Sequence, residues 1–329
     1  MIIKTFDIGW DSNFGIRQFQ HEVLEVALKN LSLSDKKAVV INSLWYTTEY
    51  HKEVLAYLHT NQVDYIILVA MIDFAIPSAE WFKEIPAKVI EVGYYNGPEE
   101  IDFFALFLDR YFFSPSTIDL CRIDRIDCPF MCLNRKPHEH RTRLYNQLQQ
   151  LNLHTRGIVS LGSDRGVAVQ TADLIIENNS MAPNSGAEQY GISNDIVTLG
   201  DMSNWSRIFL DVVTETVYNI NQHYFVSEKI YKPILGMRPF LVYADDGAEK
   251  WLGKHGFVNY LDDFSDISDL DLRQQENLVP FLEILCNQPR RYWQKKLVDL
   301  NQKIVYNKEH FYRYVDKQKL KIQKGIVCP

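Results

Sequence analysis

Apolar positions in the first part of the chain fall into two alternating patterns. Short, mostly continuous apolar runs predict strands at residues 1–8, 37–45, 63–71 and 87–95. Between them, residues 14–31 and 48–61 carry apolar positions at helical spacing. Strands that alternate with helices are typical of a parallel sheet with crossover helices, so this part predicts an α/β domain.

A second set of the same kind begins at Cys128. Strands are predicted at residues 128–135, 157–162, 209–216 and 239–244, and helices at 140–152 and 228–236. Residues 114–128 lose clear periodicity, and Pro129 precedes the new strand, which predicts a domain boundary there. We therefore expect two Rossmann-like domains, of residues 1–125 and 126–290.

Residues 291–329 form a third segment, predicted to hold C-terminal helices and a basic tail. Apolar side chains recur there at near-helical spacing, and we expect them to pack back on the first domain: Trp293, Leu297, Leu300, Ile304, Phe311 and Val315. Beyond Asp316, four lysines are predicted to have no acidic partner: Lys317, Lys319, Lys321 and Lys324. Two interpretations stay open for this tail, a solvated chain end and a weak contact with a membrane or an anionic acceptor.

Composition and charge narrow the classes of function. The chain has 329 residues and is 46% hydrophobic, enough for two domains with cores of their own. Lys and Arg number 35 against 42 Asp and Glu, and this net charge of -7 argues against a broad nucleic-acid-binding surface. No run of 18 apolar residues and no signal-peptide pattern occurs, so we expect a soluble cytoplasmic protein.

Metal ligands are sparse in the sequence. The five cysteines include Cys128 and Cys132, which have no second pair at metal-ligand spacing, so buried thiols are expected. His138 and His140 lie two apart, a spacing that suits a strand and not a helix. We predict no required metal and no cofactor.

Polar residues gather where the helix of residues 228–236 should begin. Ser227 is a good N-cap, Glu228 and Lys229 fall in the first turn, Lys232 lies one turn further, and Gly236 ends the helix. A carboxylate in this position can accept hydrogen bonds from the two ribose hydroxyls, and lysines with helix N–H groups can neutralise a diphosphate. The alternative is that Glu228 complements the helix dipole and the lysines form a solvated face.

Two further polar groups are predicted at neighbouring strand ends. Asn134 and Arg135 end one strand, Arg141 opens the next helix, and Glu215 follows another strand. Arginine at such a junction can bind a phosphate through two hydrogen bonds, although ordinary surface arginine is the alternative. Because carboxyl ends of parallel strands meet at one edge of a sheet, these residues and the start of the 228–236 helix predict one ligand site.

Thr214-Glu215-Thr216 and Phe225-Val226-Ser227-Glu228-Lys229 resemble the signature of the α-1,3-fucosyltransferase family and its looser phage, viral and bacterial relatives. The resemblance covers residues 130 to 260. It implies the GT-B arrangement, in which two Rossmann-like domains face each other across a cleft, with the acceptor side first and the nucleotide-sugar-binding domain second. By resemblance, Glu228 holds the donor ribose, Lys229 and Arg141 hold the diphosphate, and Glu215 shapes the nucleotide pocket.

The sequence departs from the family pattern at the position of the catalytic base. Gly93-Tyr94-Tyr95-Asn96 stands where the family has Gly-Glu-Asn. Inverting transfer needs a carboxylate or histidine that takes the proton of the acceptor hydroxyl. The candidates are Asp7 and Asp11 in the loop after the first strand, and Glu99.

The sequence thus predicts a metal-independent glycosyltransferase. Its donor would be GDP-fucose or another nucleotide sugar, and its acceptor a hydroxyl of a glycan or other molecule. The alternative is a non-catalytic relative that binds nucleotide sugars or glycans. An unrelated nucleotide-dependent α/β enzyme is disfavoured because neither GxGxxG nor GxxxxGK[ST] occurs.

Overall fold

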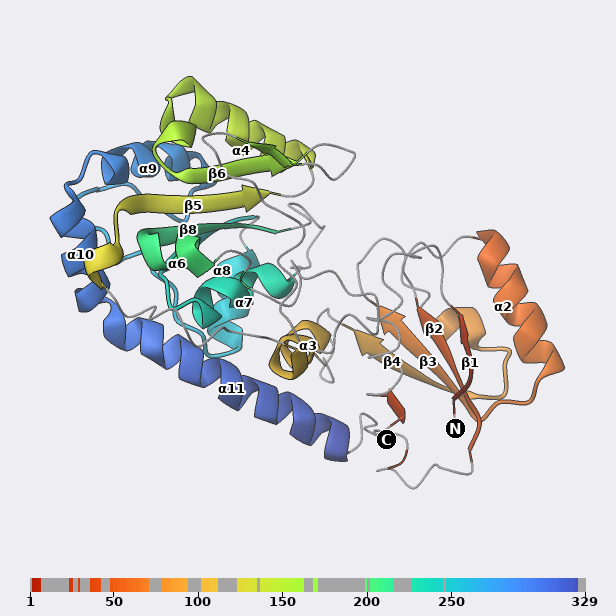
Figure 1. Ribbon diagram of the computed structural model, residues 1–329. Helices are drawn as coiled ribbons and strands as arrows, with labels where there is room; N and C mark the ends of the chain where they lie inside the picture. Colours follow the sequence, from red (N-terminus) through yellow and green to blue (C-terminus); the bar gives the residue numbers. More distant parts are fainter. Residues whose placement is uncertain are drawn as a thin grey trace. The chain divides into compact units, whose positions relative to one another are not determined.

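The computed structural model describes most of the chain and divides it into two compact units (Figure 1). The residues described are 2–6, 24–25, 29, 36–42, 48–70, 79–93, 102–111, 123–134, 137–162, 168–170, 199, 202–215, 226–244 and 247–324. Unit 1 comprises Met1–Tyr111, Gly186–Ile192 and Tyr314–Pro329, and unit 2 comprises Phe112–Ser185 and Ser193–Arg313. This division falls between residues 111 and 112, whereas the sequence analysis placed the boundary between 125 and 126.

Unit 1 contains a four-stranded sheet in the order β1-β2-β3-β4. The strands are β1 (Ile2–Phe6), β2 (Ala38–Asn42), β3 (Tyr65–Ala70) and β4 (Lys88–Gly93). Every neighbouring pair is parallel, which confirms the prediction of an α/β sheet from the apolar runs. Parallel neighbours need a crossover, and α2 (Thr48–Thr60) provides it between β2 and β3, while η2 (Ala79–Phe82) lies between β3 and β4.

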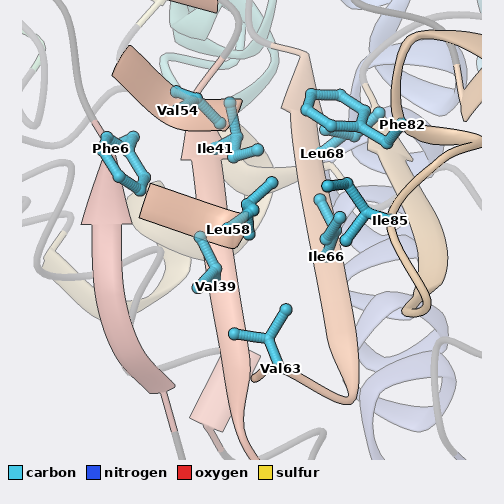
Figure 2. Packing of buried hydrophobic residues seen from close by; sticks show 10 residues of the cluster. All are labelled: Phe6, Val39, Ile41, Val54, Leu58, Val63, Ile66, Leu68, Phe82 and Ile85. Atoms are coloured by element: carbon cyan, nitrogen blue, oxygen red, sulfur yellow. The ribbon is translucent and has the colours of Figure 1, made fainter. Parts of the chain in front are cut away.

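One face of this sheet packs against α2. Val39 and Ile41 lie two apart on β2, so both side chains reach the same face, where Ile66 of β3 also lies. Val54 and Leu58 lie four apart on α2 and meet that face. Figure 2 shows these side chains together with the rest of the cluster: Phe6, Val63, Leu68, Phe82 and Ile85.

Asp102 begins helix α3 (Phe103–Tyr111) and also contacts the end of the chain. Its Oδ1 accepts a hydrogen bond from Ala105 N at 2.8 Å, which caps the helix. Its N–H donates to Gln318 Oε1 at 3.2 Å, and its Oδ2 accepts from Tyr314 Oη at 3.0 Å. Within unit 1, these buried bonds tie α3 to the last part of the C-terminal helix.

Unit 2 contains a five-stranded sheet in the order β7-β6-β5-β8-β9. The strands are β5 (Cys128–Asn134), β6 (Ile158–Gly162), β7 (Ala168–Gln170), β8 (Ile208–Thr214) and β9 (Phe240–Tyr243). All pairs are parallel except the edge pair β6–β7. The four predicted strands of this half are confirmed, and β7 was not predicted.

The helices of unit 2 connect and cover these strands. Predicted helices are confirmed as α4 (Glu139–Gln150) and α7 (Glu228–Leu235). Unit 2 also contains α6 (Met202–Arg207), α8 (Gly247–Lys254) and α9 (Leu278–Cys286), with the short turns η3 (Ile123–Arg125), η4 (Leu153–Thr155) and η6 (Gln275–Asn277). Contacts join α7 to β8 and α9 to β5.

The C-terminal segment folds into α10 (Arg290–Asp299) and α11 (Asn301–Lys324). All six residues of the predicted apolar stripe are buried. The prediction that these helices pack on the first domain needs correction. Helix α10 contacts β5 and β8, and Phe311 of α11 contacts Tyr231 of α7, so only the part of α11 from Tyr314 on belongs to unit 1.

The prediction that Lys319 has no acidic partner is wrong. Its ammonium pairs with Asp109 of α3 at 2.6 Å. The acid lies 210 positions earlier in the sequence, so a local reading of charges cannot find it. Among the helices described here, none combines the length and the apolar character that a membrane crossing requires.

Candidate nucleotide-binding site in unit 2

The sheet of unit 2 reverses its strand order between β5 and β8. After β5, the chain adds β6 on one side, whereas β8 and β9 lie on the other side. Ligands of open α/β sheets bind beyond the carboxyl ends of the strands at such a switch point. Asn134 is the last residue of β5, and Thr214 is the last residue of β8. These two predicted strand ends therefore flank the expected ligand position.

Buried hydrogen bonds join the strand ends at this point. Thr214 Oγ1 donates a short hydrogen bond to Asn134 Oδ1. The main-chain N–H of Asn134 donates to Ser160 Oγ of β6 at 3.1 Å. All three residues are buried. Asn134 thus fixes the ends of β6, β5 and β8 relative to one another.

Residues at the start of α4 hold the end of β8. Arg141 Nη2 donates to the main-chain oxygens of Thr214 at 3.1 Å and Glu215 at 3.0 Å. His140 Nε2 lies 2.9 Å from the oxygen of Glu215, and because a carbonyl only accepts, this nitrogen carries the proton. Arg141 is only 3% exposed, so its guanidinium group is almost inaccessible to solvent.

Burial shifts the pKa values of both His140 and Arg141. Burial lowers the pKa of His140, and the neighbouring guanidinium groups of Arg141 and Arg143 lower it further, against the effect of the bond to Glu215. Burial also lowers the pKa of Arg141, while the carboxylates of Glu215 and Glu228 oppose this shift. His140 is therefore neutral at neutral pH.

Glu215 connects the end of β8 to the start of α7. Its side chain is fully buried, and its carboxylate accepts hydrogen bonds from Ser227 N at 3.2 Å and from Ser227 Oγ. Burial raises the pKa of Glu215, and Lys229 and the bonds from Ser227 act in the opposite direction. Glu215 thereby fixes the first turn of α7.

Three predicted residues form the start of α7. Ser227 is the N-cap, since its Oγ accepts from Lys229 N at 3.3 Å, which confirms the predicted helix start. Lys229 Nζ donates to Glu228 Oε1 at 2.7 Å and to Ser227 Oγ at 3.2 Å. The Lys229 side chain is 27% exposed and that of Glu228 is 10% exposed. Both charged groups thus retain some access from solvent.

Asp211 is a buried acid on β8 that the sequence analysis missed. It lies inside β8, four residues before Glu215. Burial raises the pKa of Asp211 to about 7, and the charge of Lys232 on α7 lowers it. Two lysines of α7 thus act on these acids: the charge of Lys229 lowers the pKa of Glu215, and the charge of Lys232 lowers that of Asp211. The sequence signal was an aspartate inside an otherwise apolar strand.

Gly236 ends α7 as predicted, but not through a left-handed turn. Its φ is −75°, and the left-handed residue is Met237, with φ 53°. A Cβ on Gly236 would overlap the ring of Trp205. The glycine is required by this close approach. Arg238 then follows, 1% exposed, with its Nε donating to the oxygen of Ile208 at 2.9 Å.

The structure brings together six of the predicted donor-binding residues: Asn134, Arg141, Glu215, Ser227, Glu228 and Lys229. Lys232 lies one turn further along α7, and its charge lowers the pKa of Asp211. Arg135 and the candidate bases Asp7, Asp11 and Glu99 lie outside the described residues. His140 and Thr214 also belong to the cluster, although neither was proposed as a donor-binding residue.

Two neighbouring acids of unit 2 each pair with a cation. Asp262 accepts two hydrogen bonds from Arg273, at 2.8 and 2.7 Å, and Asp263 accepts two from Lys303. No group of three or more His, Cys, Asp or Glu suited to a metal ion occurs in the part of the chain that the structure describes. The described cysteines, Cys128, Cys132 and Cys286, are buried and free.

Comparisons of the chain with protein-family models, with curated proteins and with solved structures give no match. The evidence for the candidate site therefore consists of its geometry and its sequence motifs.

Proposed function

We propose that the protein is a glycosyltransferase that takes its sugar from a nucleotide-sugar donor, and that unit 2 binds the donor. One observation carries the proposal. A buried polar cluster joins the strand ends on both sides of the switch point and positions the capped, lysine-bearing start of α7 beside them. This combination of helix N-terminus, acid and lysine suits a ribose followed by a diphosphate.

Glu228 and Lys229 have separate tasks in this proposal. The Glu228 carboxylate accepts hydrogen bonds from the ribose hydroxyls, and the Lys229 ammonium, released from Glu228, neutralises the diphosphate. The first N–H groups of α7 add donors to the phosphate oxygens. Arg141 holds the end of β8, and its positive charge favours an anion at the site even without direct contact.

The proposed reaction is the transfer of a glycosyl group in a GT-B arrangement of two Rossmann-like domains. The acceptor oxygen attacks the anomeric carbon of the sugar while the bond from that carbon to the diphosphate oxygen breaks. The acceptor proton passes to a base, for which Asp7, Asp11 and Glu99 stay the candidates. The leaving diphosphate is stabilised by Lys229 and the start of α7.

Donor hydrolysis measured across a panel of nucleotide sugars tests this proposal. The panel holds GDP-fucose, GDP-mannose, UDP-glucose, UDP-galactose and UDP-N-acetylglucosamine, each in chelator and each with and without a set of free sugars as acceptors. Release of a nucleoside diphosphate from one donor, lost in Lys229→Ala and kept in Lys295→Ala, is the expected result. Lys295 is an exposed lysine of α10, so it serves as the matched control.

A non-catalytic nucleotide-sugar-binding protein is the second candidate. It is favoured by Gly93-Tyr94-Tyr95-Asn96, which lacks the acid that the resembling family carries there. The same panel separates the two candidates. Binding of a nucleotide sugar by calorimetry without any release of its diphosphate supports the second.

A further inference from the structure

Two neighbouring side chains hold the ammonium group of Lys229 at the start of α7. Its Nζ donates to Glu228 Oε1 at 2.7 Å and to Ser227 Oγ at 3.2 Å. The side chains of Glu228 and Lys229 are 10% and 27% exposed, so water screens this ion pair less than it screens a surface pair. The ammonium must therefore leave Glu228 before it can neutralise a phosphate group.

The Ser227 hydroxyl fixes the position of this ion pair. Its Oγ donates a short hydrogen bond to the buried carboxylate of Glu215 and accepts from the main-chain N and the Nζ of Lys229, at 3.3 and 3.2 Å. A hydroxyl has one donor and two acceptor positions, so these three bonds use all of it. Ser227 thus anchors the ammonium beside Glu228 and keeps no donor for a ligand phosphate.

The charges of the site balance one another. Glu215 and Glu228 are its two acids, and Arg141 and Lys229 are its two bases. The charge of Lys229 lowers the pKa of Glu215, and the charges of both acids raise the pKa of Arg141. When all four groups are ionised their formal charges cancel. A bare phosphate then gains little net attraction while Glu228 keeps its negative charge and its ammonium partner.

A ribose can take the place of the ammonium on Glu228. Its neighbouring 2′ and 3′ hydroxyls can donate to the two oxygens of one carboxylate, which is an acceptor only when ionised. A 2′-deoxyribose offers one of these two hydroxyls, and pyrophosphate offers neither. A ligand with both hydroxyls therefore compensates Glu228 most completely and releases Lys229 toward its own phosphates.

We propose that the ion pair between Glu228 and Lys229 makes the site selective for ribonucleoside diphosphates over 2′-deoxy nucleotides and over phosphates without a sugar. The inference rests on the proposed function and deepens it by naming the class of ligand. Glu228 is the residue that determines this selectivity, because recognition of the ribose is coupled through it to neutralisation of the diphosphate. The sugar donor is accordingly a ribonucleotide sugar.

Calorimetry on three variants tests this coupling. Glu228→Gln keeps the shape of the side chain and removes its charge. The matched control is Glu139→Gln, because Glu139 is an exposed acid in the first turn of α4 and its replacement changes the net charge equally. The double variant Glu228→Gln with Lys229→Met is compared with Lys229→Met alone, which separates release of the ammonium from simple loss of a repelling charge. Thermal melts establish that each variant is folded.

The probes are UDP, GDP, ADP and CDP, the 2′-deoxy form of each, and inorganic pyrophosphate. The wild type should bind its tightest ribonucleotide about tenfold or more above the 2′-deoxy form and above pyrophosphate. Glu228→Gln should bind that ribonucleotide about tenfold more weakly and pyrophosphate about fivefold more tightly. Glu139→Gln should bind all probes like the wild type. With Lys229→Met present, Glu228→Gln should not tighten pyrophosphate binding.

Three results would overturn the selectivity and leave the proposed function standing. These are pyrophosphate binding by Glu228→Gln that is undetectable or no tighter than in the wild type, an equal gain in pyrophosphate affinity when Lys229→Met is present, and equal affinity of the wild type for the ribose and 2′-deoxy forms. Absence of binding by all four ribonucleotides in the wild type would overturn the proposed function together with the selectivity.

Discussion

Removing the buried charge of Asp211 should change how stability depends on pH. Asp211 is 7% exposed, and its pKa in the folded protein is about 7, against an ordinary value of 3.8. The folded state therefore binds a proton more tightly than the unfolded state does. Between pH 3.8 and pH 7 the free energy of unfolding falls as pH rises, because the folded protein must give up that proton.

The size of this pH effect on stability follows from the shift in the pKa of Asp211. A difference of roughly three pKa units corresponds to about 4 kcal/mol at pH 8. Asp211→Asn keeps the shape of the side chain and carries no ionisable group. We expect this variant to be more stable than the wild type at pH 8, by an amount of up to about 4 kcal/mol, and equally stable near pH 4.

Thermal and urea unfolding at pH 4, 6 and 8 measure the difference. Asp269→Asn is the control, because Asp269 is exposed and lies far along the chain from β8. The control should follow the wild type at every pH. A constant loss of stability in Asp211→Asn at all three values would refute the reasoning, since it would mean that the charged form of Asp211 is well accommodated.

Three further changes test other parts of the structure. Ser227→Ala removes a helix cap and one donor to the buried carboxylate of Glu215, so urea unfolding should show a loss of about 2–4 kcal/mol; a loss below 0.5 kcal/mol would contradict these contacts. Gly236→Ala places a methyl group against a tryptophan ring and should cost about 1–3 kcal/mol in the same assay, and wild-type stability would show that the ring moves freely. Gln318→Ala removes the acceptor for Asp102 N and should lower the melting temperature without changing nucleotide affinity in unit 2; an unchanged melt would show that this buried bond is not needed.

Local patterns predicted the two sheets and the helix starts. Continuous apolar runs are specific for buried parallel strands, and the strands around Val39 and Ile66 were found in this way. Ser227 was found because N-cap chemistry depends on a few neighbouring residues. The expectation that polar strand ends meet at one edge follows from parallel pairing alone.

Features that depend on distant residues escaped the sequence analysis. The ion pair of Lys319 with Asp109 joins residues 210 positions apart, and the burial of Asp211 depends on the packing of the whole sheet of unit 2. Arg141 was interpreted as a phosphate ligand, yet it donates hydrogen bonds to the main-chain oxygens of Thr214 and Glu215. The type of side chain predicts which bonds it can make, and the fold determines which partner it meets.

Nucleoside diphosphate binding by the wild type and by Lys229→Ala is the most direct test of the proposed donor site. Each of GDP, UDP, ADP, CDP and dTDP is titrated by calorimetry in chelator, with Lys295→Ala as control. We predict that at least one binds the wild type and Lys295→Ala alike, and that Lys229→Ala weakens it by about 1.5–3 kcal/mol, as expected for a charge-assisted contact. Equal affinity in Lys229→Ala and the wild type, or no binding of any of the five, would contradict a diphosphate site at the start of α7.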